Sequence, residues 1–325
     1  MAAAFASWTP APGTWPLRRY DPANTAHNPT ATPPRETPTP RELASVSTSA
    51  KRPRVLPVVG SDHVALYGTG LTVYPRGGGE TVRAADAPTP LAGFGADGRL
   101  HTVRQPAGDS DPPAAVVGYD AADSREAYRV RLDTDGPTGL TVGAREVYVG
   151  TENGTLRAVA PGRGRRWRVD GAMPALVDGR LYATDAPLDG TVAYARRTGL
   201  GRHLRAEPER RWSAGPVDGF PRAPAVADGR LVLGSDAEGG GVVAAFDAAS
   251  GDRLWEPRAL GRNVATPAVV GDRGYVAAAV TERRGLVAAL DLTTGETLWR
   301  DDVEWQATVP TASDDTLRRR RRDAG

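Results

Sequence analysis

Histidine is the side chain best suited to bind a metal ion or to move a proton near neutral pH. This chain has four, at His27, His63, His101 and His203. Metal sites draw on ligands at short, recurring spacings, and these four are scattered. We therefore expect no metal site and no histidine-based catalysis, and we interpret each histidine as a surface or turn residue.

Other patterns that carry chemistry are missing as well. No serine stands in a Gly-x-Ser-x-Gly setting, which would support a nucleophilic hydrolase. The glycines of 68–70 and 77–79 open no helical pattern, as a phosphate-binding loop would, and favour hairpin turns. The adjacent carboxylates Asp301-Asp302 and Asp314-Asp315 would point to opposite faces of a strand. We predict no catalytic residue.

The elements that would position any site are indicated by a repeat. Trp167, Trp212, Trp255 and Trp299 follow one another at intervals of 45, 43 and 44 residues. A fixed period in this range is typical of an array of supersecondary units. The last two copies share Ala, Asp, Gly and Trp at the same positions, namely Ala245, Asp247, Gly251 and Trp255 in one and Ala289, Asp291, Gly295 and Trp299 in the other.

Weaker copies extend the repeat upstream, where Asp120 and Tyr128 keep the acid and the aromatic residue. A second phrase opens each unit, with a proline and a short apolar run at Pro174, Pro224 and Pro267, followed by an Asp-Gly or Gly-Asp turn signal. Each unit of 40–45 residues thus contains four short strands. This arrangement is typical of a propeller blade.

The phrase Ala-x-Asp-x-x-x-Gly-x-x-x-Trp at 245–255 and 289–299 resembles the tryptophan-docking motif of pyrroloquinoline-quinone (PQQ)-like repeat propellers. That superfamily includes the quinoprotein alcohol dehydrogenases and the lipoprotein scaffold of the bacterial outer-membrane barrel-assembly machine. The N-terminal segment 15–28 also resembles the start of a subgroup common in extreme halophiles. The resemblance covers residues 15–317 and is weakest in the first third.

The resemblance implies that each docking tryptophan packs against the next blade, and that the glycine permits the turn that places it. Repetition favours this packing role over a quinone-stacking role. The quinoproteins of the superfamily use eight blades on a longer chain, and often paired cysteines and calcium ligands. This chain has no cysteine, so we expect no cofactor, PQQ included.

Counting the repeats predicts an all-β propeller of four-stranded blades, seven in number with the last one incomplete. Its fourth-strand positions fall near Leu43, Arg83, Tyr128, Trp167, Trp212, Trp255 and Trp299. An N-terminal strand near 43–49 is expected to close the ring. We divide the chain into a flexible Pro/Thr/Ala-rich N-terminal lead-in (1–40), the propeller (41–317) and a disordered Arg-rich tail (318–325).

The tail, with five consecutive arginines from Arg318 to Arg322, is open to two interpretations. It could contact nucleic acid or an anionic membrane, or it could be a solvated end left by a lost reading frame, which we prefer. Without 318–323 the chain carries a net charge of −2. We therefore predict no nucleic-acid partner. A second arginine cluster near 197–211 is interpreted as a solvated loop.

No stretch reaches the roughly 18 apolar residues of a membrane span. The first residues lack the basic start of a signal peptide, and no lipoprotein cysteine is present. Relatives of this kind are commonly exported, so the location stays open. We expect a monomeric, non-catalytic binding or scaffold module that presents loops to an unknown protein or cell-envelope partner. The alternatives are a PQQ-dependent oxidoreductase and a ligand-sensing propeller.

Overall fold

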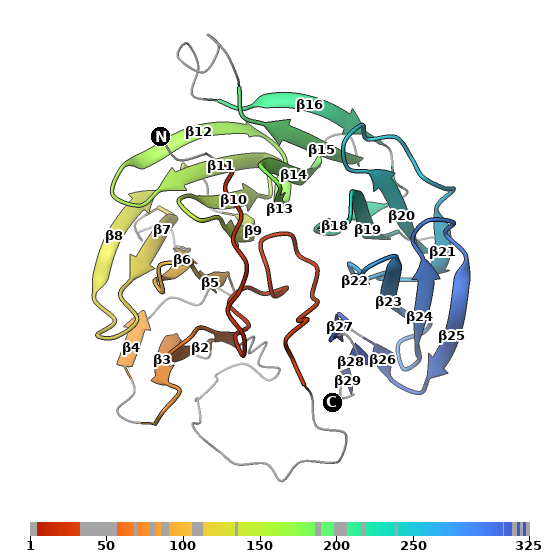
Figure 1. Cartoon of the computed structure of the whole chain (residues 1–325), viewed down its shortest axis with the longest axis horizontal. Helices are drawn as coiled ribbons and strands as arrows, with labels where there is room; N and C mark the ends of the chain where they lie inside the picture. Colours follow the sequence, from red (N-terminus) through yellow and green to blue (C-terminus); the bar gives the residue numbers. More distant parts are fainter. Residues whose placement is uncertain are drawn as a thin grey trace.

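A computed structural model of the chain describes most of its residues. The described residues are 5–32, 57–67, 70–78, 82–85, 91–105, 113–133, 136–185, 190–197, 207–215, 217, 219–237, 240–307, 309–313, 317–318 and 321–322. Every regular element among them is a β-strand. The strands form a ring of antiparallel sheets around a central axis (Figure 1).

Six sheets of four or more strands follow one another along the chain, and we call them blades one to six. Blade one contains β1 (Val58–Val59), β2 (His63–Tyr67), β3 (Leu71–Pro75) and β4 (Val82–Ala85). Blade two contains β5 (Ala92–Phe94), β6 (Leu100–Arg104), β7 (Ala115–Tyr119) and β8 (Glu126–Arg131). Blade three contains β9 (Pro137–Val142), β10 (Val147–Thr151), β11 (Thr155–Ala160) and β12 (Gly164–Asp170).

The second half of the ring continues the pattern. Blade four contains β13 (Ala172–Val177), β14 (Arg180–Asp185), β15 (Gly190–Ala195) and β16 (Glu209–Ala214). Blade five contains β17 (Phe220–Pro221), β18 (Ala225–Ala227), β19 (Arg230–Asp236), β20 (Gly241–Asp247) and β21 (Arg258–Gly261), with β17 and β18 both paired to β19. Blade six contains β22 (Ala268–Val270), β23 (Arg273–Ala279), β24 (Gly285–Asp291) and β25 (Thr297–Val303).

Four two-residue strands follow blade six. They are β26 (Gln306–Ala307), β27 (Thr311–Ala312), β28 (Leu317–Arg318) and β29 (Arg321–Arg322). β26 pairs with β29, and β27 pairs with β28. The propeller of four-stranded blades is as predicted, whereas the count of seven and the domain boundaries stay predictions. The strand expected near 43–49 lies outside the described residues.

The core lies between the blades. Central strands such as β20 and β24 are buried along six of their seven residues. Blades four and six cover the two faces of β20, whereas β24 packs on blade five with one face and near Val303 and Trp305 with the other. Small residues keep these faces close together. One cluster joins Val243 and Ala245 of blade five to Leu286 and Leu290 of blade six. The unbroken apolar runs of the sequence are therefore strands buried on both faces.

The N-terminal segment 5–32 lies inside the ring, where Figure 1 shows it in red. Its residues 14–28 are mostly buried, and Ala26 and Phe5 are almost fully inaccessible to solvent. Its composition suggested a flexible lead-in, but the structure differs. The innermost strands of several blades donate hydrogen bonds to its backbone carbonyls and so hold the segment in place.

Backbone hydrogen bonds tie this segment to the innermost strands of successive blades. The carbonyl oxygens of Pro22, Ala23, Thr25 and Ala26 accept from strands β13, β18, β22 and β27, in that order. The four donors are the backbone N–H groups of Leu176, Val226, Val269 and Ala312, at 2.6, 2.9, 2.9 and 2.9 Å. Each donor lies two residues after the proline that opens its repeat, so the recurring proline phrase is the strand that contacts the hub.

Two side chains of the segment bind the opening prolines themselves. Asn24 Nδ2 donates to the carbonyls of Pro174 and Pro224, both at 3.0 Å. Arg19 donates to the carbonyls of Pro267 and Asn24. Both side chains are buried. We call residues 19–28 the central hub.

The same segment spans the seam between the last described strands and blade one. Trp15 exchanges two backbone hydrogen bonds with Val59 of β1, at 2.7 and 2.8 Å. On the other side, Asn28 N–H donates to the carbonyl of Ala312 in β27 at 2.9 Å. The N-terminal segment therefore joins the two ends of the strand array.

Candidate functional site

The repeated motif predicted from the sequence forms a tight turn in blades five and six. Asp247 Oδ1 accepts from the backbone N–H groups of Ala249 and Ser250, both at 2.8 Å. Asp291 Oδ1 accepts in the same way from Thr293 and Thr294, at 2.7 and 3.0 Å. These hydrogen bonds lower the pKa of both carboxyl groups, because they favour the charged form.

The glycine that ends each turn packs against the indole of the preceding blade's tryptophan, and we call this contact the glycine seat. Gly251 and Gly295 have φ angles of +83° and +73°, a conformation that favours glycine. A Cβ atom on either would lie 2.6 Å from the indole of Trp212 or Trp255, respectively. The two indole N–H groups donate to the carbonyls of Ala248 and Leu292, at 3.2 and 3.0 Å.

The alanine of the motif lies under the aromatic residue of its own blade. Ala289 is opposite Trp299 across β24 and β25, and Ala158 and Ala193 are opposite Trp167 and Trp212. A register shift follows each of these alanines at once. Such a bulge re-aims the neighbouring side chain. Ala245 of blade five is likewise fully buried.

The remaining tryptophans differ in what covers them. Trp167 contacts Phe5 of the N-terminal segment, with ring centroids 5.7 Å apart. Trp299 stacks loosely on Tyr275 of its own blade and is 42% exposed. Its neighbour Leu298 is 49% exposed. Blade six therefore presents apolar side chains that the described residues leave uncovered.

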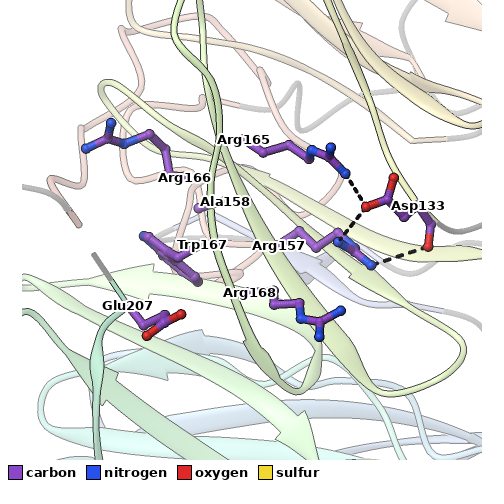
Figure 2. Close-up of a pocket in the computed structure, with 8 residues that line it drawn as sticks. All are labelled: Asp133, Arg157, Ala158, Arg165, Arg166, Trp167, Arg168 and Glu207. Carbon is purple, nitrogen blue, oxygen red and sulfur yellow. Dashed lines mark hydrogen bonds and ion pairs between the residues drawn. The ribbon is translucent and has the colours of Figure 1, made fainter. Parts of the chain in front are cut away.

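A pocket on the outer rim of blade three is lined mainly by charged residues. Its volume is about 310 Å³. Figure 2 shows its lining residues, which are Asp133, Arg157, Ala158, Arg165, Arg166, Trp167, Arg168 and Glu207. Asp133 contacts both Arg157 and Arg165. Five arginines within twelve residues were a visible signal of this site in the sequence, but no recognised motif singled them out.

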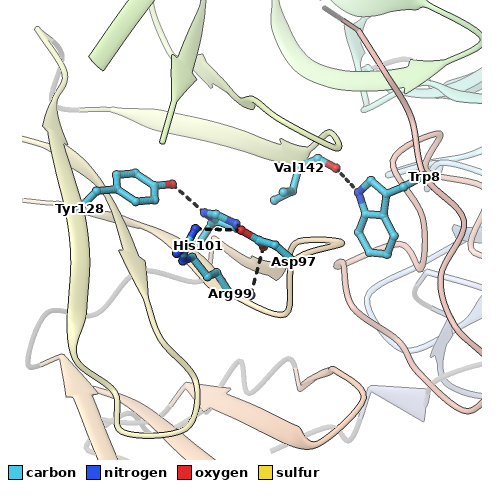
Figure 3. A network of polar contacts seen from close by, with 6 residues as sticks. All are labelled: Trp8, Asp97, Arg99, His101, Tyr128 and Val142. Atoms are coloured by element: carbon cyan, nitrogen blue, oxygen red, sulfur yellow. Dashed lines mark hydrogen bonds and ion pairs between the residues drawn. The ribbon is translucent and has the colours of Figure 1, made fainter. Parts of the chain in front are cut away.

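Blade two contains a polar network in place of a docked tryptophan (Figure 3). Asp120 begins the turn and accepts from Ala122 N–H at 3.2 Å, while the Tyr128 hydroxyl lies 2.6 Å from His101 Nδ1. Burial raises the pKa of Tyr128, so the phenol stays protonated and can donate. His101 is 2% exposed, which corrects its expected place at the surface.

The other ring nitrogen of His101 faces Asp97, with 3.8 Å between Nε2 and Oδ1. The contact with His101 is the main reason that the pKa of Asp97 falls from 3.8 to about 2. A carboxyl group whose pKa is lower in the folded state stabilises the fold above its unfolded pKa, and this contribution is lost on acidification.

We therefore expect the Asp97→Asn variant to lose less stability than the wild type as pH falls from about 4 to 2. The effect should be modest, because Asp97 is 46% exposed and solvent screens the pair. Urea midpoints measured across this pH range test the prediction. Glu256→Gln, at a side chain that is 84% exposed, is the control. Identical pH profiles for Asp97→Asn and the wild type would contradict it.

The residues present do not fit a quinone cofactor at the centre of the ring. The axis is filled by the hub, whose Asn24, Arg19 and Ala26 side chains are buried against the inner strands. The chain has no cysteine to stack on a quinone. In the part of the chain that the structure describes, no three His, Asp or Glu residues gather as metal ligands, and no helix is long and apolar enough to span a membrane.

Comparisons with known proteins agree with this architecture. A family model described as outer membrane protein assembly factor BamB matches residues 178–321. The computationally designed Ika8 protein is similar over 83% of this chain and 81% of its own, with a TM-score of 0.64 and 12% identity. A europium-containing methanol dehydrogenase is similar over 94% and 81%, with a TM-score of 0.58 and 12% identity.

A putative 6-phosphogluconolactonase from Bacteroides uniformis ATCC 8492 is similar over 73% of this chain and 77% of its own, with a TM-score of 0.52 and 15% identity. These likenesses concern the fold, because the identities are low. No curated protein matches the sequence.

Proposed function

We propose that this chain, a β-propeller built of PQQ-like repeats, is a non-catalytic binding or scaffold module for a protein partner. The family model that matches 178–321 is named for an outer-membrane assembly factor, which supports an assembly role in the cell envelope. A ring centre occupied by the chain's own N-terminal segment leaves the rim and the faces for recognition.

The observation that carries the proposal is the uncovered side of blade six. In blades four and five the docking tryptophan is seated on a glycine turn of the next blade, whereas Trp299 is 42% exposed beside Leu298 at 49%. Exposed apolar side chains on the outermost strand of a sheet can receive a partner strand. The glycine turns that contact Trp212 and Trp255 show which kind of segment would pack against Trp299.

The expected partner segment is therefore a β-hairpin whose turn carries a glycine and offers a backbone carbonyl to the indole N–H. Gly251 with Ala248, and Gly295 with Leu292, are the intramolecular examples. Aromatic and apolar anchors of this kind commonly dominate the energy of protein interfaces.

Site-specific photo-crosslinking in the native host tests the proposal. A photoreactive residue at position 299 should give a discrete adduct that maps to a glycine-containing turn of one partner. The matched control is position 300, since Arg300 is exposed on the same strand and its side chain points to the other face. Equal labelling from both positions, or none from 299, would count against a docking surface at blade six.

A further inference from the structure

Strand register places three arginines on one face of blade three. Arg157 of β11 is directly opposite Arg168 of β12, and Val159 is opposite Arg165. Residues opposite each other on neighbouring strands point to the same side, as do residues two apart on one strand. The bulge between Ala158 and Val159 brings Arg165 to this face. Figure 2 shows Arg157 and Arg165 converging on Asp133.

One carboxylate, that of Asp133, pairs with two of these three arginines. Asp133 Oδ2 pairs with Arg165 and lies 3.9 Å from Arg157 Nη1. Arg168 makes no ion pair with any described residue. The three arginines and Asp133 therefore leave a surplus of two positive charges.

The burial of Arg157 makes this surplus of positive charge energetically unfavourable. Its side chain is only 8% exposed, and its Nε has no hydrogen-bond partner among the described residues. Burial lowers the pKa of Arg157, opposed by Asp133 and reinforced by Arg168 and Arg165. Buried charges are normally paired and hydrogen-bonded. The apo site thus holds an incompletely compensated cation beside an open cavity of about 310 Å³.

We infer that the rim pocket binds a phosphate monoester, held by Arg157, Arg165 and Arg168. A dianion would offset the surplus of two charges, and its oxygens suit the forked donors of guanidinium groups. The cavity volume lies at the lower end of the range of small-molecule sites. It exceeds what a phosphate alone would fill, so the pocket has room for the organic part of the ligand. This inference does not depend on the proposed docking surface of blade six.

Calorimetric titration at low ionic strength tests the inference, with inorganic phosphate and glycerol 3-phosphate as probes and the full chain as receptor. We expect both to bind. Removing one arginine by Arg165→Gln or Arg168→Gln should weaken each by about tenfold, the usual value of a charge-assisted hydrogen bond. Binding to vesicles that contain phosphatidate, compared with neutral vesicles, shows whether the pocket also binds the phosphate of a lipid headgroup.

Two further variants distinguish binding at the rim pocket from nonspecific attraction to positive charge. Arg300→Gln removes an arginine of similar exposure, 47% against 51% for Arg165, that is likewise paired to one aspartate, and should leave affinity unchanged. Asp133→Asn removes the competing carboxylate and should tighten binding. The inference is overturned if no probe binds, if Arg300→Gln weakens binding as much as Arg165→Gln, or if Asp133→Asn fails to tighten it. Circular dichroism of each variant confirms the fold.

Discussion

Trp255→Ala should lower the free energy of unfolding by about 3–5 kcal/mol, the range seen for buried aromatic residues. The indole is 8% exposed, packs on Gly295 of the next blade, and donates to the carbonyl of Leu292 at 3.0 Å. Its removal opens a cavity between blades five and six and leaves that carbonyl without its indole donor. Urea unfolding followed by circular dichroism measures the loss without relying on tryptophan fluorescence.

Trp299→Ala is the matched control, because it changes the same repeat position where the indole is 42% exposed. Its expected cost is about 1 kcal/mol, since a half-exposed side chain loses less burial and leaves no closed cavity. Equal losses for Trp255→Ala and Trp299→Ala would show that seating on the next blade contributes nothing to the stability of the ring.

The contact between Trp255 and Gly295 can also be tested by changing the glycine. Gly295→Ala would place a Cβ atom 2.6 Å from the Trp255 ring at a φ of +73°, so both overpacking and backbone strain oppose it. In the Trp255→Ala background only the strain remains, because the ring is gone. The two substitutions should therefore cost less together than the sum of their separate effects. Simple additivity would mean that the indole does not occupy the glycine seat.

The blades could be predicted because their signals are local and repeated. Trp212 and Trp255 fix the period, and the Asp247 and Asp291 turns mark the same point in each copy. Strands such as β20 and β24 could be found as unbroken apolar runs, because both of their faces are buried. Each of these features acts within one blade or between neighbours, so a single sequence contains enough to find them.

The central hub could not be predicted in the same way. Residues 19–28 have no period, and their contacts use backbone carbonyls, which any residue possesses. The prolines of the second phrase were visible, but their common target lies up to 248 residues away, as for Arg19 and Pro267. Nothing local in Pro174 or Pro224 indicates that one asparagine binds both.

The rim pocket and the His101 network depend on register. The bulge after Ala158 determines which arginines share a face with Arg157, and a shift of one residue would reverse every side chain. His101 lies on the buried strand β6 and contacts Tyr128, which occupies the position of tryptophan in other copies. Sequence patterns place such residues on strands but do not give the pairing that brings them together.

Deleting residues 1–32 is expected to abolish cooperative unfolding of the ring, the largest effect that the structure predicts. The hub supplies hydrogen-bond acceptors to four inner strands, and the N-terminal segment joins β27 to β1 across the seam through Asn28 and Trp15. Without it, buried backbone groups lose their partners, and each costs about 1–3 kcal/mol. A synthetic peptide of residues 5–32 added in trans should restore a cooperative transition. A shortened chain that unfolds like the full one would show that the blades close the ring unaided.

Substitutions of Asn24 give the same prediction at the level of one side chain. Asn24 has a φ of +60°, so Asn24→Ala adds backbone strain to the loss of donors for Pro174 and Pro224, whereas Asn24→Gly removes the donors without the strain. Asn24→Gly should therefore cost about 2–4 kcal/mol for two deprived carbonyls, and Asn24→Ala about 1 kcal/mol more. Thr9→Ala, an exposed position of the same segment, should be nearly neutral. If Asn24→Gly matches Thr9→Ala, the two carbonyls find other donors, and the hub acts through its backbone bonds alone.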